Sequence, residues 1–412
     1  MITGGTPNPG GKKILFIAAP GAIPAQSTSG TPMIFTSIIN TFADQGWSIG
    51  YLCLLKDKNW ADDDELHRQA KESPVSKAVR YWIERYTYAE PDRAAAETVI
   101  EEFEPDVIYC LGHRAANTIV DAKTDAYRIC TFYDSQHMGQ IEKILYLLRW
   151  NRPRTWAWAL IALPYVWAQY KEHAQKEIPI LKKRDLTISH SHDTSLIYKR
   201  KLGTNVGYFP NPLEVVEPLE RVEQNDAPPT FMLSGAINST VSYAGLKFFL
   251  DEVLPHLRQE LENDEIQIKI TGGGRLSKDL YPLRDIPNVH LMGYLSHEDL
   301  LKEYQIAKAL IVPTPIKMGF RTRIMDAFRR GVPTIVHSAN QAGFRELEHN
   351  KNCLMVSNGR DMAELIKQTA KGATNTGPIA QQALEEFQTR YSVGHFVDYI
   401  KKLVSENSAK PW

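Results

Sequence analysis

The stretch ALIVPTPIKMGFRTRIMDAFRRGVPTIV, residues 309–336, decides the fold. It begins with an apolar run that predicts a buried strand, and a proline-containing loop follows that strand. After this loop, apolar residues recur at helical spacing, at Ile324, Ala327 and Phe328. Gly331 and Pro333 end the helix before a second apolar run. The stretch therefore predicts strand, loop, helix and strand, as in one βαβ unit.

Two arginines and an aspartate lie at the start of this helix. Arg321 and Arg323 are two residues apart, so their side chains point the same way if the chain is still extended there. Guanidinium groups beside free helix N–H groups suit a phosphate-rich ligand, and Asp326 could accept hydrogen bonds from ribose hydroxyls. The alternative is that both arginines are solvated and that Asp326 only complements the helix dipole.

The composition excludes several classes of protein. Lys and Arg total 48, as do Asp and Glu, so the chain lacks the basic excess of a nucleic-acid-binding protein. Four scattered cysteines without a CxxC pair indicate buried thiols in a reducing, cytoplasmic compartment rather than disulfides or a zinc site. We expect no metal site at Asp62-Asp63-Asp64 either, because this run opens a polar helix far from any strand end. No apolar run reaches transmembrane length.

Alternating strand and helix patterns predict two α/β doubly wound domains. A flexible tail, 1–12, precedes the first domain, 13–212. A polar, proline-containing segment, 213–229, predicts a linker, and the pattern restarts in a second domain, 230–385. A last helical pattern lies within 386–412. Because neither domain opens with GxGxxG and no Walker signature is present, we expect a two-domain enzyme with a cleft rather than a dehydrogenase or an NTPase.

Other candidate residues follow predicted strands, where open α/β sheets place their chemistry. Gly30 follows the first strand, and Asp134 and His137 follow the strand 128–133. A histidine can share a proton or bind a substrate hydroxyl, so His137 is the candidate catalytic residue and Asp134 its orienting partner. The alternatives are that His137 caps the next helix and that Gly30 only serves a turn. In the second domain, glycines after strands would let backbone approach a base and ribose, at Gly272 and Gly293.

Residues 145–170 are rich in tryptophan and arginine. Such a segment can lie at a membrane surface, which would add a peripheral membrane contact to a cytoplasmic protein. However, Pro153 and Pro164 interrupt the segment, so we favour a pair of helices that covers the domain core. The four tryptophans are Trp150, Trp156, Trp158 and Trp167.

Together these stretches resemble the GT-B glycosyltransferases, in particular the retaining enzymes of glycosyltransferase family 4. The resemblance covers nearly the whole chain and is strongest from Ser234 to Val356. It implies two Rossmann-like doubly wound domains facing a central cleft. The first domain would bind the acceptor and the second the nucleotide sugar. The terminal helix would cross back to the first domain.

The resemblance also assigns residues. Asp326 matches the later glutamate of the family's Glu-x7-Glu pattern and would hold the ribose, whereas Met318 stands at the earlier glutamate, which usually touches the donor sugar. The run 319–323 resembles the G-x-R-x-K of a family subset, which implies that Arg321 and Arg323 bind the diphosphate in place of basic residues missing from the loop GAINSTVSYAG. Gly343 and Glu346 align with a glycine and a glutamate of the following loop. The implied nucleotide-sugar site comprises Gly30, Gly235, Asn238, Gly272, Gly293, Tyr294, Gly319, Phe320, Arg321, Thr322, Arg323 and Asp326.

The function implied by the resemblance is transfer of a hexose, with retention, from a nucleotide diphosphate sugar to an acceptor hydroxyl. UDP is expected from its frequency in the family, with no metal or other cofactor. The acceptor would be a sugar, a lipid-linked compound or a small molecule in polysaccharide or glycoconjugate synthesis. His137, within the run 133–137, would belong to the family's active-site histidine region. The alternatives are a non-hydrolysing sugar-nucleotide epimerase and a non-catalytic sugar-nucleotide-binding protein.

Overall fold

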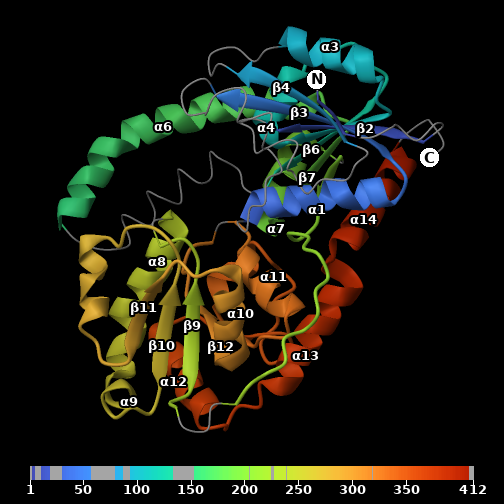
Figure 1. The fold of residues 1–412 in the computed structure, drawn as a ribbon. Coiled ribbons are helices and arrows are strands. Elements are labelled where there is room, and N and C mark those ends of the chain that lie inside the picture. The colour runs from blue at the N-terminus through green and yellow to red at the C-terminus, as the bar shows by residue number, and fades with distance from the viewer. Residues whose placement is uncertain are drawn as a thin grey trace. The chain divides into compact units, whose positions relative to one another are not determined.

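The computed structural model describes residues 2–4, 11–18, 30–56, 79–86, 93–132, 153–203, 205–223, 227–237, 239–317 and 319–407 (Figure 1). The chain divides into two compact units. The first comprises Met1–His137, Trp167–Glu214 and Tyr391–Trp412, and the second comprises Met138–Val166 and Val215–Arg390. Each unit is a mostly parallel sheet with helices around it, so the predicted pair of α/β domains is confirmed.

The first unit contains an eight-stranded sheet in the order β1-β4-β3-β2-β5-β6-β7-β8. Of these strands, β1 runs antiparallel to its neighbour, β4. Part of the predicted N-terminal tail therefore forms an edge strand, because its backbone pairs with a strand that the sequence did not indicate. The strands are β1 (Ile2–Gly4), β2 (Lys13–Ala18), β3 (Ser48–Lys56), β4 (Val79–Tyr86), β5 (Val107–Leu111), β6 (Tyr127–Phe132), β7 (Leu186–Ser189) and β8 (Val206–Tyr208).

Aromatic residues fill the core of the first unit. The fully buried ring of Phe16 in β2 lies 5.5 Å from Phe35 and 5.1 Å from Tyr109. The last helix of the chain joins the same unit, where the ring of Phe396 lies 5.0 Å from that of Phe209. The helices of this unit are α1 (Gly30–Asp44), α3 (Arg93–Phe103), α4 (Gly112–Thr118), α7 (His192–Leu202) and α14 (Val393–Asn407), joined by part of α6 (Pro153–Lys182).

Helix α6 continues through Pro164, where the sequence predicted an interruption between two helices. It is a single helix of 30 residues. Pro153 is its first residue, where the missing N–H costs nothing, and the helix continues through Pro164. Among its described side chains, those deeply buried lie near the C-terminal end, at Glu177 and Leu181. No helix in the described ranges is both long enough and apolar enough to cross a membrane.

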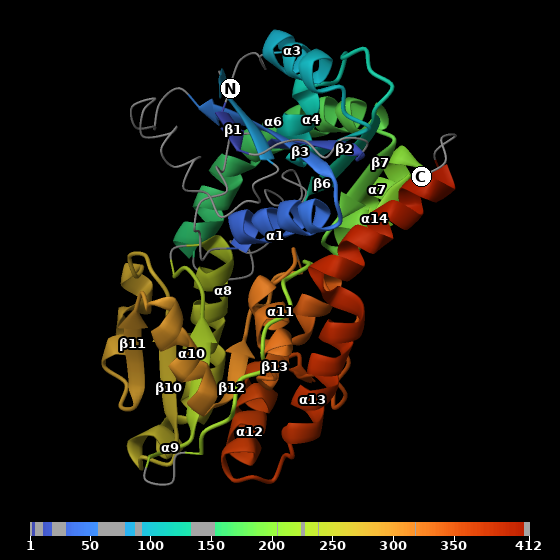
Figure 2. The ribbon, with the colours of Figure 1, turned by 45° about the vertical axis from the view of Figure 1, so that its right-hand side comes forward.

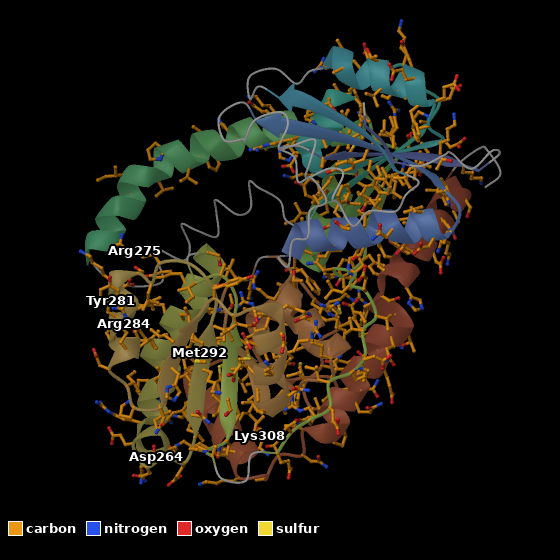
Figure 3. All side chains as sticks on the ribbon, in the orientation of Figure 1. Asp264, Arg275, Tyr281, Arg284, Met292 and Lys308 are labelled. Carbon is orange, nitrogen blue, oxygen red and sulfur yellow. The ribbon has the colours of Figure 1, made fainter. Side chains whose placement is uncertain are left out.

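The second unit contains a six-stranded parallel sheet in the order β11-β10-β9-β12-β13-β14. Its central strands are buried on both faces, as in sheets that helices cover on each side, and the edge strand β11 is partly exposed. Figure 3 shows Arg275 at the carboxyl end of this sheet and Asp264 and Lys308 at its amino end. The strands are β9 (Thr230–Ser234), β10 (Gln267–Thr271), β11 (Val289–Gly293), β12 (Ala307–Val312), β13 (Thr334–His337) and β14 (Leu354–Val356).

The helices beside these strands are visible in Figure 2. Helix α8 begins at Thr240, where Ser239 caps it by accepting a hydrogen bond from the Ser242 N–H. The helices are α8 (Thr240–Phe248), α9 (Arg258–Glu262), α10 (His297–Ile306), α11 (Thr322–Arg329), α12 (Gly359–Ala370) and α13 (Gly377–Glu386), with shorter turns at Phe249–Val253, Leu254–His256, Lys278–Arg284, Ser338–Ala342 and Phe387–Tyr391.

The cysteines match the prediction of buried thiols where the structure describes their side chains. Cys110, Cys130 and Cys353 are buried and unbridged. Burial raises the pKa of Cys110 and that of Cys353 to about 12. These thiols are therefore core residues rather than reactive groups.

Candidate functional site

The strand order of the second unit identifies an edge where ligands bind. The order reverses between β9 and β12, and open α/β sheets bind ligands beyond the carboxyl ends of the strands at such a reversal. Gly235 follows β9 at this point, and the loop 313–320 follows β12. The first turns of α8 and α11 come next in the chain. The N-terminal ends of two helices therefore lie at one edge of the sheet.

Three of the predicted glycines lie in adjoining loops. The Gly235 N–H donates to the Thr271 carbonyl at 3.1 Å, and the Gly272 N–H donates to the Gly293 carbonyl at 2.7 Å. Gly235 has a φ of 128° and Gly272 a φ of 141°, a region that other residues rarely adopt. A Cβ on Gly272 would lie 2.0 Å from the Gly235 carbonyl oxygen. Only glycine permits this approach, so the three loops are held at fixed positions.

Arg323 reaches across from α11 to α8. Its Nη2 donates to Ser242 Oγ at 2.8 Å. A Cβ on Gly235 would lie 2.3 Å from the same Nη2, so the guanidinium rests directly on the glycine backbone. Burial lowers the pKa of Arg323, but an arginine stays protonated at neutral pH. The positively charged guanidinium of Arg323 is thus held over the Gly235 backbone, between the N-terminal ends of α8 and α11.

The pocket beneath Arg323 is small. It is lined by the ends of β9, β10 and β12 together with Arg323, Ser242 and Gly245. Its free volume is about 10 Å³, which is about the space that one water molecule needs. A diphosphate is much larger than one water molecule, so it does not fit inside this pocket.

Asp326 lies one turn further along α11 and is held by two buried arginines. Its Oδ1 accepts hydrogen bonds from Arg329 Nε at 2.8 Å and from Arg330 Nε at 3.2 Å. The buried Tyr304 hydroxyl lies 3.3 Å from Ser234 Oγ at the end of β9. Burial is the main cause of the raised pKa of Tyr304, and the Asp326 charge raises it further. The carboxylate of Asp326, which the sequence predicted for the site, is therefore close to the carboxyl end of β9.

Arg321 has a different environment from Arg323. It is buried, and its Nη2 donates to the Ile316 carbonyl at 3.3 Å, within the loop that precedes α11. Phe320 is also buried, with its ring 5.0 Å from that of Phe344. The structure therefore separates the two predicted arginines. Arg321 and Phe320 support the loop from inside, whereas Arg323 lies at the helix starts.

Glycine also shapes the loop after β12. Gly319 has a φ of 71°, and a Cβ on Gly343 would lie 2.0 Å from the Gly319 carbonyl oxygen. A side chain at position 343 would clash with this carbonyl, which explains why a glycine stands where the resemblance also places one. The nearby Glu346 side chain is 28% exposed, with Oε1 3.7 Å from Arg345 Nε.

The remaining predicted residues are scattered or undescribed. Tyr294 is 72% exposed beside Gly293, Thr322 is the first residue of α11, and Gly30 is the first residue of α1 in the first unit. Among the described residues, no three His, Cys, Asp or Glu side chains are close enough together to hold a metal ion. The predictions that lie outside the described residues are those for Asp62, Asp63, Asp64, Asp134, His137, Asn238 and Met318.

The first unit has a comparable edge, and sequence analysis missed part of it. Its strand order reverses between β2 and β5, and α4 begins directly after β5. His113 in α4 has its Nδ1 4.0 Å from Oε1 of Glu177, a buried carboxylate in α6. Sequence analysis could not identify Glu177 and Ser242 as site residues, because their contacts join segments that are distant in sequence.

Comparisons with known proteins agree with this geometry. Residues 228–372 match the family model described as Glycosyl transferases group 1. No curated protein sequence matches the chain. The matched region includes the six strands of the second sheet and every residue of the candidate site from Gly235 to Asp326.

Solved structures resemble the chain over almost its full length. Sucrose-phosphate synthase from Thermosynechococcus elongatus has a TM-score of 0.69 and 14% identity, covering 96% of this chain and 100% of that chain. HepE of Anabaena in complex with UDP has a TM-score of 0.64 and 13% identity, covering 96% and 100%. TarM of S. aureus, in a complex that includes UDP, has a TM-score of 0.67 and 11% identity, covering 95% and 99%. The chain thus has the GT-B fold, and its residues 228–372 are similar to the domain that the group 1 glycosyltransferase model describes.

Proposed function

We propose that this protein is a retaining glycosyltransferase that transfers a sugar from a UDP-sugar to an acceptor hydroxyl. The observation that carries the proposal is the Arg323 guanidinium, resting on Gly235 at the strand reversal of a glycosyltransferase domain. UDP as the nucleotide is supported by two of the similar structures. HepE is seen with UDP-glucose as well as UDP, and TarM with UDP.

The donor diphosphate would lie over Gly235. A bare glycine backbone allows close approach, and the first turns of α8 and α11 offer N–H groups to an anion. Arg323 adds a full positive charge at the same place. The ribose would be bound by Asp326, because its ion pairs with Arg329 and Arg330 use Oδ1 and leave Oδ2 to accept ribose hydroxyls.

In the transfer step, the bond between the anomeric carbon and the diphosphate oxygen breaks, and the acceptor oxygen forms a new bond to that carbon. Negative charge grows on the departing diphosphate as the bond breaks. Arg323 and the helix N–H groups stabilise that charge most strongly in the transition state, which lowers the barrier. In this single step, retention requires the acceptor to approach on the face from which the diphosphate leaves. The proton of the acceptor hydroxyl is then close to the diphosphate oxygens, which can accept it.

We assign the acceptor to residues of the first unit. His137 and Asp134 are the candidates from sequence, and the His113–Glu177 pair at the end of β5 is a second polar group at the carboxyl edge of that sheet. Met318, at the position of the family's earlier glutamate, supplies no carboxylate to the donor sugar. Recognition of that sugar would therefore depend on other groups.

A binding experiment tests the donor site directly. UDP, GDP, ADP and TDP are titrated calorimetrically into the wild-type protein, the Arg323→Ala variant and a control, Arg258→Ala. Arg258 is an exposed arginine on α9 that pairs only with Glu262 among the described residues. We expect UDP to bind the wild type and the control equally and the Arg323→Ala variant much more weakly.

An activity assay tests the reaction. UDP release is measured from a panel of UDP-sugars with and without sugar and lipid acceptors, and the anomeric configuration of the product is read by NMR. UDP release that depends on an acceptor, with retention, supports the proposal. Conversion of the donor sugar without UDP release would indicate an epimerase. Tight UDP-sugar binding without any turnover would indicate a non-catalytic binding protein.

A further inference from the structure

Helix α6 exposes a cluster of large apolar side chains. Leu160 is 61% exposed, Ile161 70%, Leu163 39% and Trp167 57%. These four are half of the eight large apolar residues that are exposed within the described part of the chain. They lie within eight residues of one another, so the exposure is concentrated at one place.

The spacing places most of these side chains on one face of the helix. Leu160, Leu163 and Trp167 follow one another at steps of three and four residues, and Ile161 flanks them. At the other end of α6, Glu177 is buried. The N-terminal half of α6 therefore presents an apolar stripe to solvent, whereas the C-terminal end packs into the first unit.

The charged residues within 145–170 are all positive, and Lys171 and Glu172 follow this segment. Residues 145–170 contain three arginines and no aspartate or glutamate. Lys171, four residues after Trp167, is exposed and so continues the same helix face with a positive charge. An apolar stripe with tryptophan and flanking cations matches the interface of an anionic lipid bilayer, where the apolar groups enter the acyl boundary and the cations meet lipid phosphates.

We propose that the exposed face of α6, defined by Leu160, Ile161, Leu163, Trp167 and Lys171, docks this protein on an anionic membrane surface. No described helix can cross a bilayer, so α6 would lie along the surface rather than span it. The charge pattern favours lipid over a second copy of the chain, because two such faces would bring like charges together. This inference is independent of the donor site.

Vesicle co-sedimentation tests the proposal on the full-length protein. Vesicles of phosphatidylcholine alone and of phosphatidylcholine with phosphatidylglycerol in a 3:1 ratio are compared at low and high salt. The wild type should bind the anionic vesicles and lose most of this binding at high salt, because screening weakens the attraction to phosphates. Ile161→Glu and Lys171→Glu should each reduce the partition coefficient about tenfold or more.

Two matched variants control for the change of charge itself. Val215→Glu alters another exposed apolar residue, and Lys201→Glu alters another exposed lysine, both outside α6. Both should bind vesicles like the wild type. The proposal is overturned if the wild type does not bind anionic vesicles, or if the α6 variants and their controls lose binding equally. Light scattering that shows Ile161→Glu separating a dimer, with no vesicle binding, would instead identify the face as an interface between two copies.

Discussion

Arg323 donates a hydrogen bond from Nη2 to Ser242 Oγ, 2.8 Å away, and so joins the first turn of α11 to the first turn of α8. The two residues are 81 positions apart in the chain. The bond fixes one end of a long, rotatable side chain above Gly235. In the proposed donor site, Ser242 would act through Arg323 and would therefore be a positioning residue.

Ser242→Ala removes this acceptor without touching the charge. We expect UDP affinity to fall by a factor of about 5 to 10, corresponding to about 1 kcal/mol for a hydrogen bond that orders a charged group. Calorimetric titration of UDP measures the effect. In an Arg323→Ala background the same substitution should have almost no effect, since the two residues act as a pair. Additive losses in the double variant would contradict this role.

Replacing Arg321 or Arg323 by alanine should have different effects on kcat and on stability. Arg323→Ala should lower kcat by a factor of about 10² to 10³, as loss of one oxyanion donor does, with little change in the urea midpoint. Arg321→Ala should lower the free energy of unfolding, because the Ile316 carbonyl inside the loop loses its donor. Steady-state kinetics and urea unfolding of both variants test this division. Equal loss of kcat at equal stability would contradict it.

Gly235→Ala should separate backbone strain from displacement of Arg323. The new Cβ would lie 2.3 Å from Arg323 Nη2, and a φ of 128° suits only glycine. We expect a loss of about 1–3 kcal/mol in the free energy of unfolding and a loss of UDP binding. Gly372→Ala is the control, because Gly372 has a φ of 70° and a Cβ added there would meet no described atom within 4 Å. The control should lose stability but keep UDP affinity, whereas loss of affinity in both would contradict the assignment.

Asp326→Ala should destabilise the protein as well as weaken ribose binding. Arg329 and Arg330 are each about 5% exposed and would lose their carboxylate partner. Breaking a buried ion pair by removing one member costs about 3–5 kcal/mol. Urea unfolding measures the loss, with Glu262→Ala as the control, because the exposed Glu262–Arg258 pair contributes at most about 1 kcal/mol. Equal losses of unfolding free energy in the two variants would show that Asp326 contributes no more to stability than the exposed Glu262 does.

Sequence analysis found those features of the fold that local patterns encode. The buried strands of both sheets are apolar runs, and Gly235, Gly272 and Gly293 follow or end three of them, at positive φ values that favour glycine. The antiparallel pair β1 and β4 was missed, because β1 has only three residues and pairing between distant segments leaves no local signal. The helix break predicted at Pro164 was wrong, because one helix, Pro153–Lys182, continues through it.

The sequence predicted those residues of the candidate site whose role depends on backbone conformation or on their place after a strand. The environments of Arg321 and Arg323 differ because one turns back into its loop and the other crosses to α8, a choice that spacing along the chain does not determine. Ser242 and Tyr304 enter the site through tertiary contacts alone. Long polar side chains are thus the least predictable part of the site, and glycines the most predictable.

His190 should make the stability of the protein depend on pH. Its Nδ1 lies 2.9 Å from the Phe209 carbonyl, and burial lowers its pKa from 6.5 to about 4. The folded protein keeps the imidazole neutral down to about pH 4, whereas the unfolded chain binds the proton near pH 6.5. Acid therefore favours unfolding, and this contribution is fully present above pH 6.5 and is lost between pH 6.5 and 4, by about 3 kcal/mol at most. Urea unfolding at pH 7.5 and pH 4.5 should show a smaller difference for His190→Asn than for the wild type. The exposed His290→Asn control should keep the wild-type difference, and an unchanged pH dependence in His190→Asn would show that this imidazole is protonated in the folded state.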